Sequence, residues 1–236
     1  MAPPVARVPV ERVSIEPVSV ELLPGLILHP GYLDGPARTR LAAELAARLA
    51  VAPPYRPRMP RTGRPFSVTM TNCGPLGWVS DAAGYRYQAH HPETGAPWPA
   101  IPDVALRAWD DLAGYPDPPE AALVNLYAAD ARMGLHQDRD EAALDAPVLS
   151  LSLGASALFR YGGVNRGDPT RSVRLNAGDA LVMGGAARLV HHGIDRILPR
   201  PPDLLGGEGM PAFLPPDGRC NLTLRRVTRP ERAPTA

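Results

Sequence analysis

The stretch 148-VLSLSLGASALFRYGG-163 contains two of the short strands that decide the fold of this chain. Residues 148–153 and 157–161 are rich in residues typical of strands, and the glycine pair 162–163 is a turn signal. The pattern recurs from residue 121 onward, and the further predicted strands are residues 121–127, 172–175, 180–183, 189–192 and 219–227. Many short strands at this spacing indicate a sandwich or jelly roll.

Two helices and one strand are predicted before this β-rich part. Residues 36–49 form an amphipathic pattern, in which Leu41, Leu45 and Leu49 recur at i, i+4 and i+8. A second helix is predicted over residues 103–113 and a short strand over residues 66–71. Because the helices come first, we expect them to cover one sheet. The expected fold is α+β but mostly β, and residues 1–20 are expected to form a loose arm or an edge strand.

The length and composition indicate one domain, or one domain plus a terminal extension. The chain has 236 residues, and its 30 prolines and 22 glycines favour many short elements over a helical bundle. No apolar run approaches the roughly 18 residues of a membrane span, and the first residues lack the apolar stretch of a signal peptide. Cys73 and Cys220 are too few for a disulfide framework and are expected to be buried reduced thiols. We therefore expect a cytoplasmic protein with no membrane partner.

The charge is nearly balanced, with a net charge of +1, so no global field attracts this protein to nucleic acid. The basic side chains other than histidine are all arginines. A local cluster, Arg56, Arg58, Arg61 and Arg64, contains no acidic residue. Arginine suits bidentate phosphate contacts better than lysine does. The cluster therefore indicates a phosphate-binding loop, and the alternative is a general preference for arginine.

The tripeptide His136-Gln137-Asp138, with a histidine doublet at 191–192, is a candidate metal site. Two imidazoles and one carboxylate form the facial triad that binds ferrous iron in oxygenases. His136 and Asp138 project to the same side if the segment is extended. The alternative is that His136 is an ordinary structural histidine.

The C-terminal strand carries polar side chains on one face. Arg219, Asn221, Thr223 and Arg225 follow the period of two that places alternate residues on the same side of a strand. Arginines at the ends of a strand near a metal site indicate an anionic co-substrate. The alternative is a solvated sheet edge, which we expect for Arg226 and Arg229.

Several motifs, in the same order along the chain, resemble those of the bacterial AlkB family. They are MTNCGPLGW (70–78), NLY (125–127), LHQDRDE (135–141), HGI (192–194) and RCNLTLR (219–225). This family consists of iron(II)- and 2-oxoglutarate-dependent dioxygenases that demethylate alkylated nucleobases. The resemblance covers residues 64–228 and implies a double-stranded β-helix (jelly roll) with a nucleotide-recognition lid.

The resemblance implies roles for particular residues. The iron ligands would be His136, Asp138 and His192, because His192 is the histidine followed by Gly-Ile; His191 would point to the opposite face. The implied 2-oxoglutarate-binding residues are Asn125, Tyr127, Arg219, Asn221 and Arg225. Arg219 would pair with the distal carboxylate with help from Tyr127, and Arg225 and Asn125 would lie near the end that chelates iron.

The implied substrate residues are Trp78, Tyr85 and Asp140. A methylated base must leave the stack to reach a buried iron, and flipped bases are held by aromatic stacking. Trp78 would stack on the base opposite His136, and Asp140 would lie near its exocyclic amine. The four-arginine cluster would contact the nucleic-acid backbone. The alternative is that Trp78 is a core residue and Asp140 a solvated one.

The reaction implied is oxidative demethylation of N-alkylated bases, such as 1-methyladenine and 3-methylcytosine, in DNA or RNA. It would use Fe(II), 2-oxoglutarate and O₂ and release succinate, CO₂ and formaldehyde. One alternative is an oxygenase of the same chemistry that acts on a protein or a small molecule. Another is a catalytically inactive nucleic-acid-binding module, against which the intact triad and both arginines argue.

The expected organisation has four parts. Residues 1–50 are an N-terminal extension with a helix, residues 51–118 are the lid with a supporting helix, residues 119–228 are the jelly-roll core, and residues 229–236 are a tail. The expected partner is alkylated single- or double-stranded nucleic acid, and the protein is expected to act as a monomer.

Overall fold

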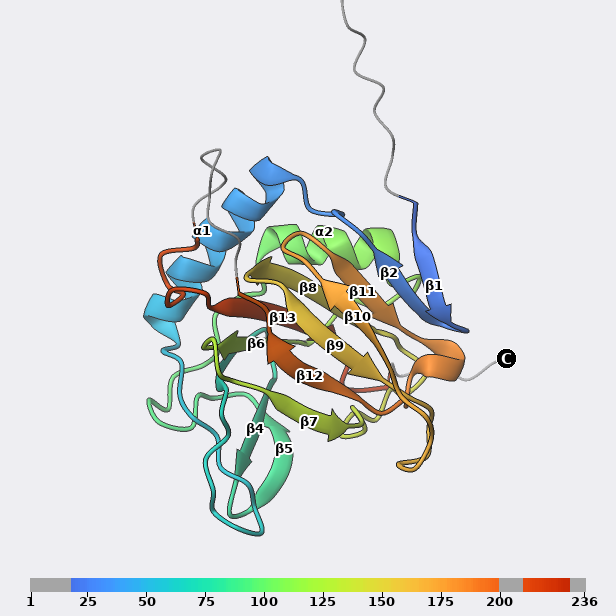
Figure 1. Cartoon of the computed structure of the whole chain (residues 1–236). Helices are drawn as coiled ribbons and strands as arrows, with labels where there is room; N and C mark the ends of the chain where they lie inside the picture. Colours follow the sequence, from blue (N-terminus) through green and yellow to red (C-terminus); the bar gives the residue numbers. More distant parts are fainter. Residues whose placement is uncertain (1–17, 200–209, 230–236) are drawn as a thin grey trace, which may run out of the picture.

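A computed structural model describes residues 18–199 and 210–229 (Figure 1). Most of the expected N-terminal arm and of the C-terminal tail lies outside these residues. The helices are α1 (Gly35–Val51) and α2 (Asp103–Leu112), with one 3-10 turn, η1 (Gly185–Ala187). The strands are β1 (Val20–Leu23), β2 (Leu26–His29), β3 (Thr69–Cys73), β4 (Gly77–Asp81), β5 (Gly84–Gln88), β6 (Ala121–Tyr127), β7 (Met133–His136), β8 (Val148–Gly154), β9 (Ala157–Tyr161), β10 (Arg171–Leu175), β11 (Ala180–Met183), β12 (His192–Ile197) and β13 (Arg219–Arg225). The expectation of an α+β, mostly β fold is confirmed.

The strands form two main antiparallel sheets and one separate hairpin. The major sheet has seven strands in the order β1-β2-β11-β8-β13-β6-β3, and the minor sheet has four in the order β10-β9-β12-β7. Among the described strands, β4 and β5 pair only with each other, and Figure 1 shows them below β7, at the bottom of the view. The major sheet therefore takes in strands from residues 20–29 and 69–73, outside the segment 119–228 expected to form the core.

The helices cover the outer face of the major sheet. Alternate residues of β8 and β13, such as Leu151 and Leu222, pack with Leu41 and Leu45 of α1 and with Trp109 of α2. α1 begins where the Asp34 carboxylate accepts a hydrogen bond of 2.8 Å from the Ala37 amide, a standard N-cap. The prediction that the helices cover one sheet is thus confirmed.

The inner faces of the two sheets enclose a second apolar cluster. It contains Leu123 and Tyr127 of β6, Phe159 of β9, Leu181 of β11 and Ile194 of β12. Because strand side chains alternate, the same β13 that packs leucines against the helices presents its polar residues to this interior. The functional side chains therefore point between the sheets.

The prediction of a strand over residues 189–192 was wrong, because β12 begins at His192. The preceding residues follow η1 in a tight turn, in which the Val190 amide donates to the Ala187 carbonyl. The His191 amide donates to Gly163 in the β9–β10 connection rather than to a neighbouring strand. The short strands β1, β2, β4, β5 and β7 were not predicted.

No helix in the described ranges 18–199 and 210–229 is long and apolar enough to cross a membrane. Both cysteines are buried and unpaired, as expected from the sequence.

Candidate metal centre and its cavity

The pairing of β7 with β12 brings the two candidate histidine ligands together. His136 ends β7 and is the register partner of His192, the first residue of β12, so the ring centroids lie 4.5 Å apart. A β-carbon at Gly193 would collide with the carbonyl oxygens of Met133 and Gly134. Glycine after His192 is therefore a packing requirement of this strand pair.

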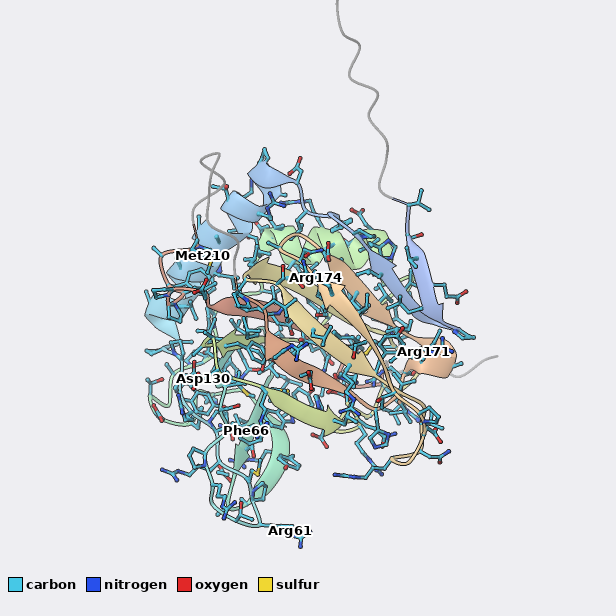
Figure 2. All side chains as sticks on the ribbon, in the orientation of Figure 1. Arg61, Phe66, Asp130, Arg171, Arg174 and Met210 are labelled. Carbon is cyan, nitrogen blue, oxygen red and sulfur yellow. The ribbon has the colours of Figure 1, made fainter. Side chains whose placement is uncertain are left out.

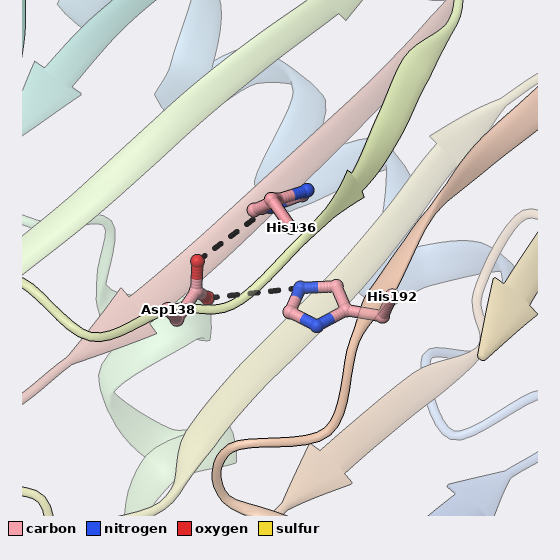
Figure 3. Close-up of side chains that lie close together, drawn as sticks. All are labelled: His136, Asp138 and His192. Atoms are coloured by element: carbon pink, nitrogen blue, oxygen red, sulfur yellow. Dashed lines mark ion pairs between the residues drawn. The ribbon is translucent and has the colours of Figure 1, made fainter. Parts of the chain in front are cut away.

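Asp138 completes the group from the loop after β7. The extended segment that was expected to include both His136 and Asp138 ends at His136. Its carboxylate oxygens lie 3.6 Å from Nε2 of His136 and 3.9 Å from Nε2 of His192 (Figure 3). One ligand atom from each residue lies within 4.8 Å of the others. His136, Asp138 and His192 therefore form a metal-binding triad. His191 is not part of it, and its Nδ1 lies 3.4 Å from the Gly163 carbonyl.

Backbone carbonyls orient both histidine rings for metal binding. Nδ1 of His136 lies 2.9 Å from the Gly134 carbonyl, and Nδ1 of His192 lies 3.1 Å from the Val190 carbonyl. A protonated Nδ1 that donates to a carbonyl leaves Nε2 with a free lone pair, and such contacts fix the tautomer of metal-bound histidines. In both residues Nε2 is the nitrogen that faces Asp138.

The charge states of the buried ligands also suit a cation. Burial opposes the ionised form of Asp138, but Arg225 and the two histidines outweigh it and hold the pKa of Asp138 below its usual range. Burial and the neighbouring His136 lower the pKa of His192 to about 4. At neutral pH the triad therefore offers an anionic oxygen and an uncharged imidazole at its buried positions.

A buried network, which the sequence did not reveal, surrounds Asp138. Arg225 donates to Asp138 Oδ2 from Nη2 at 2.7 Å and lies 3.2 Å from Glu141 Oε1. Arg188 donates from Nη2 to Glu141 Oε2 at 3.0 Å and from Nη1 to the Asp138 carbonyl at 2.5 Å. Tyr87 of β5 donates its hydroxyl proton to Glu141 Oε1. Asp138 is thus held at both its side chain and its backbone.

Arg219 is a fully buried cation, and no carboxylate in the described part of the chain lies within ion-pair distance of it. It donates to Ser152 Oγ at 2.7 Å and to the Ala155 carbonyl at 3.2 Å, while Nε has no partner among the described residues. Burial lowers the pKa of Arg219. An unpaired buried charge is costly, so this position is suited to an anion supplied from outside the chain.

Two further buried polar atoms near the triad, Asn125 Oδ1 and Arg225 Nη1, lack partners within residues 18–199 and 210–229. Asn125 and Tyr127 lie opposite Asn221 and Arg219 in the β6–β13 register, and Asn221 donates to Ser150 Oγ at 2.5 Å. Buried polar groups normally have hydrogen-bond partners. The unpartnered donors of Arg219 and Arg225 fit a small dianion with a carboxylate at each end, which 2-oxoglutarate is.

A cavity of about 740 Å³ joins the triad to the outside. Its wall includes the triad, Asn125, Tyr127, Asn221, Arg225, Trp78, Tyr85 and Asp140. Arg219 does not line it, but its register partner Tyr127 does. Most residues predicted from the sequence therefore meet in one space, and Arg219 would meet a ligand at the deep end.

Aromatic side chains of the β4–β5 hairpin form the outer part of this wall. The rings of Trp78 and Tyr85 are stacked, 5.5 Å apart at 20°, and Phe66 meets Trp78 edge-on at 6.3 Å. Trp78 is only partly buried, and its Nε1 donates to Asp140 Oδ2 at 2.8 Å. Trp78 packs against the inner apolar cluster and also lines the cavity, whereas Trp98 and Trp109 are buried in the core.

The four arginines of the cluster are exposed, on the loop beside the hairpin. Arg58 donates its backbone amide to Ser80 and its side chain to the Gly63 carbonyl at 3.0 Å, whereas Arg61 stands at the far tip of the loop (Figure 2). Met59 and Pro65 from this loop line the cavity. Three more arginines at the cavity wall, Arg132, Arg139 and Arg166, are exposed and were not predicted.

The fold and the triad define the class of protein, and comparisons with known proteins agree. The family model of the 2OG-Fe(II) oxygenase superfamily matches residues 25–225. An AlkB homologue from Caulobacter vibrioides (strain NA1000 / CB15N), named as an alpha-ketoglutarate-dependent dioxygenase, is 50% identical over 206 residues, which are 87% of this chain and 89% of that protein. AlkB of Escherichia coli (strain K12) is 47% identical over 146 residues, 60% of this chain and 67% of that protein.

A solved structure, described as that of OsALKBH1, superimposes with a TM-score of 0.70 at 32% identity and covers 89% of this chain and 100% of that chain. The chain thus belongs to the 2OG-Fe(II) oxygenase superfamily and, within it, to the AlkB family. It is an Fe(II)- and 2-oxoglutarate-dependent dioxygenase.

Proposed function

We infer that this dioxygenase oxidatively demethylates N-alkylated nucleobases, such as 1-methyladenine and 3-methylcytosine, in DNA or RNA. The observation that carries this inference is that one cavity contains both the metal triad and an aromatic wall suited to a flat ring. Bound Fe(II), with 2-oxoglutarate and O₂, would supply the oxidation of the N-alkyl carbon, which then leaves as formaldehyde. The chain supplies binding and orientation.

Arg219 is the proposed partner of the distal carboxylate of 2-oxoglutarate. Its unpartnered Nε, and the absence of a carboxylate within ion-pair distance in the described part of the chain, support this role. Tyr127, next to it in the register, would add its hydroxyl, whose pKa is raised by burial, so that it remains a donor. Asn125, Asn221 and Arg225 would surround the end of the molecule nearest the triad.

Trp78 and His136 are the proposed stacking partners on the two sides of the base. Both line the cavity, and stacking on aromatic rings is how flipped bases are held. Tyr85 would support Trp78 from behind through their stacked rings. Asp140, which is fixed by Trp78 Nε1, places a carboxylate where a cationic methylated base would be favoured.

The arginine loop is the proposed contact with the nucleic-acid backbone. Arg56, Arg61 and Arg64 are exposed beside the cavity mouth, where phosphates flanking a flipped base would pass. Such contacts give affinity that falls with salt. We also assign the β4–β5 hairpin as the nucleotide-recognition lid and the two facing sheets as a jelly roll, with residues 51–118 and 119–228 as the lid and core segments. We further propose that the protein acts as a monomer.

The experiment that tests this function is product analysis on methylated oligonucleotides. Purified protein loaded with Fe(II) and 2-oxoglutarate should release formaldehyde and restore the unmodified base. Succinate formation without formaldehyde from any methylated oligonucleotide would refute the nucleobase substrate and leave the oxygenase chemistry intact. A protein or a small molecule would then be the substrate to test.

A further inference from the structure

The β4–β5 hairpin has no strand partner in either main sheet of the described residues, so it is held by side chains and by the backbone bond from Arg58 to Ser80. The Asn72 amide fixes β4, because it donates to the Trp78 carbonyl and accepts from the Trp78 amide, both at 3.0 Å. The end of β5 is held by Trp98, whose Nε1 donates to the Gln88 carbonyl at 2.8 Å. Neither contact leads to the metal centre.

Tyr87 makes a contact of a different kind. It is the register partner of Trp78, and its hydroxyl donates to Glu141 Oε1. Glu141 is 6% exposed and comes from the same short segment as Asp138. The hairpin therefore meets the metal-binding segment at two adjacent points: Trp78 with Asp140 and Tyr87 with Glu141.

Two arginines connect Glu141 to Asp138. Its Oε2 accepts from Arg188 at 3.0 Å, and its Oε1 lies 3.2 Å from Arg225. Arg225 then reaches the Asp138 carboxylate at 2.7 Å, and Arg188 reaches the Asp138 backbone carbonyl at 2.5 Å. Two cations and two carboxylates balance in charge, so Tyr87 adds a neutral donor to a compensated network. Three successive contacts, through Glu141 and one of the two arginines, thus connect Tyr87 to a metal ligand.

We propose that Tyr87 is a positioning residue, whose hydroxyl couples the β4–β5 hairpin to the metal centre. A cation at Asp138 competes with Arg225 for that carboxylate. Arg225 then interacts more strongly with Glu141, and this interaction holds in place the Glu141 carboxylate that accepts the Tyr87 hydrogen bond. Assembly of the metal site then steadies the hairpin that carries Trp78 and Tyr85. Only one consequence rests on the proposed function, namely that base binding depends on an assembled metal site.

Hydrogen–deuterium exchange with Fe(II) alone, under anaerobic conditions, tests the coupling without nucleic acid. Iron should slow exchange of the amides of residues 77–88 in the wild-type protein. In Tyr87→Phe, which keeps the ring, this iron-dependent slowing should fall about 10-fold or more, as expected for the loss of one hydrogen bond to a charged group. The matched control is Tyr32→Phe, which removes a 2.7 Å hydroxyl–carboxylate bond to Asp111 at the surface and should behave as wild type.

Equal iron-dependent protection in Tyr87→Phe and wild type would overturn the proposal, as would a wild-type hairpin that does not respond to iron. A second measurement uses a DNA oligonucleotide that carries 1-methyladenine. Tyr87→Phe should then form about 10-fold more succinate per formaldehyde than wild type, and an unchanged ratio would overturn the consequence for catalysis. A wild-type protein that releases no formaldehyde would refute the proposed function, while the iron measurement would still decide the coupling.

Discussion

The two ends of the cavity are built in opposite ways. At the deep end, Asp138, His192 and Arg225 line the cavity, and Arg219 lies next to the lining residue Tyr127; we call these residues the metal wall. All four are at most 9% exposed and are held by other buried side chains or carbonyls. At the outer end, the rim, Tyr85 is 52% exposed, and the four-arginine loop lies in solvent. Electrostatic contacts are strong and geometrically strict at the metal wall, and weak and screened by salt at the rim. Substitutions should therefore have very different effects at the two ends.

The largest effect is expected at the triad. Asp138→Ala removes the only anionic ligand and leaves Arg225 facing the two histidines, so iron binding and 2-oxoglutarate turnover should be abolished. His136→Ala should have the same outcome. Iron content after anaerobic loading, measured with succinate formation, checks both. The matched control is His191→Ala, which should retain most activity, and stoichiometric iron in Asp138→Ala would contradict the assignment.

Arg219→Ala tests the deepest part of the metal wall. A charge-assisted bidentate contact is worth about 1.5–3 kcal/mol, so 2-oxoglutarate should bind roughly 10- to 150-fold more weakly, while iron binding changes little. Calorimetric titration of the metal-loaded protein measures this. Arg226→Ala removes an arginine of the same segment that pairs with Glu120 and should leave the affinity unchanged. Equal affinities in the two variants would exclude the role of Arg219.

Trp78→Ala tests the transition between the metal wall and the rim. Base–aromatic stacking is worth about 1–3 kcal/mol, so demethylation of an oligonucleotide with 1-methyladenine should fall by roughly 5- to 150-fold. Succinate formation without substrate should survive, because the triad is untouched. Trp78→Phe keeps an aromatic face and should recover part of the loss. If Trp78→Ala slowed both reactions equally, stacking would not be the role of Trp78.

The smallest effect is expected at the rim. Replacing Arg56, Arg58, Arg61 and Arg64 by glutamine should weaken oligonucleotide binding roughly 10-fold at low salt and much less at high salt. The slope of log affinity against log salt should become shallower by about 0.7 for each phosphate of a single strand that the loop no longer neutralises. Arg40→Gln with Arg107→Gln, on the exposed sides of α1 and α2, is the control. A slope that does not change in the loop variant would exclude the loop as a backbone contact.

The sequence predicted more of the metal wall than of the network that supports it. The triad could be predicted because His136 and Asp138 are neighbours in sequence and because the motif around each ligand is long. The arginines of β13 could be predicted because the period of two places them on one face. Glu141, Arg188 and Tyr87 were not assigned, because their contacts span 47 and 54 residues and follow no local pattern.

The same distinction holds for the fold. Long runs with clear alternation, such as residues 121–127 and 157–161, were predicted with their full extent, and helix α1 was predicted to within two residues at each end. β7, with only four residues, was missed, and the strand around His192 was placed too early. A short strand is stabilised by its neighbours, so its limits depend on partners that the local sequence does not name.

The sequence by itself determined the ligand types, the face of each long strand and the family, because these depend on side-chain chemistry and short-range periodicity. Only the tertiary structure decided that Arg219 is buried with no described carboxylate in ion-pair distance and that a hydroxyl on a separate hairpin contacts the metal network. It also decided that the arginine loop stays exposed at the rim. These outcomes depend on which surfaces exclude water when distant segments pack, and that is a property of the whole chain.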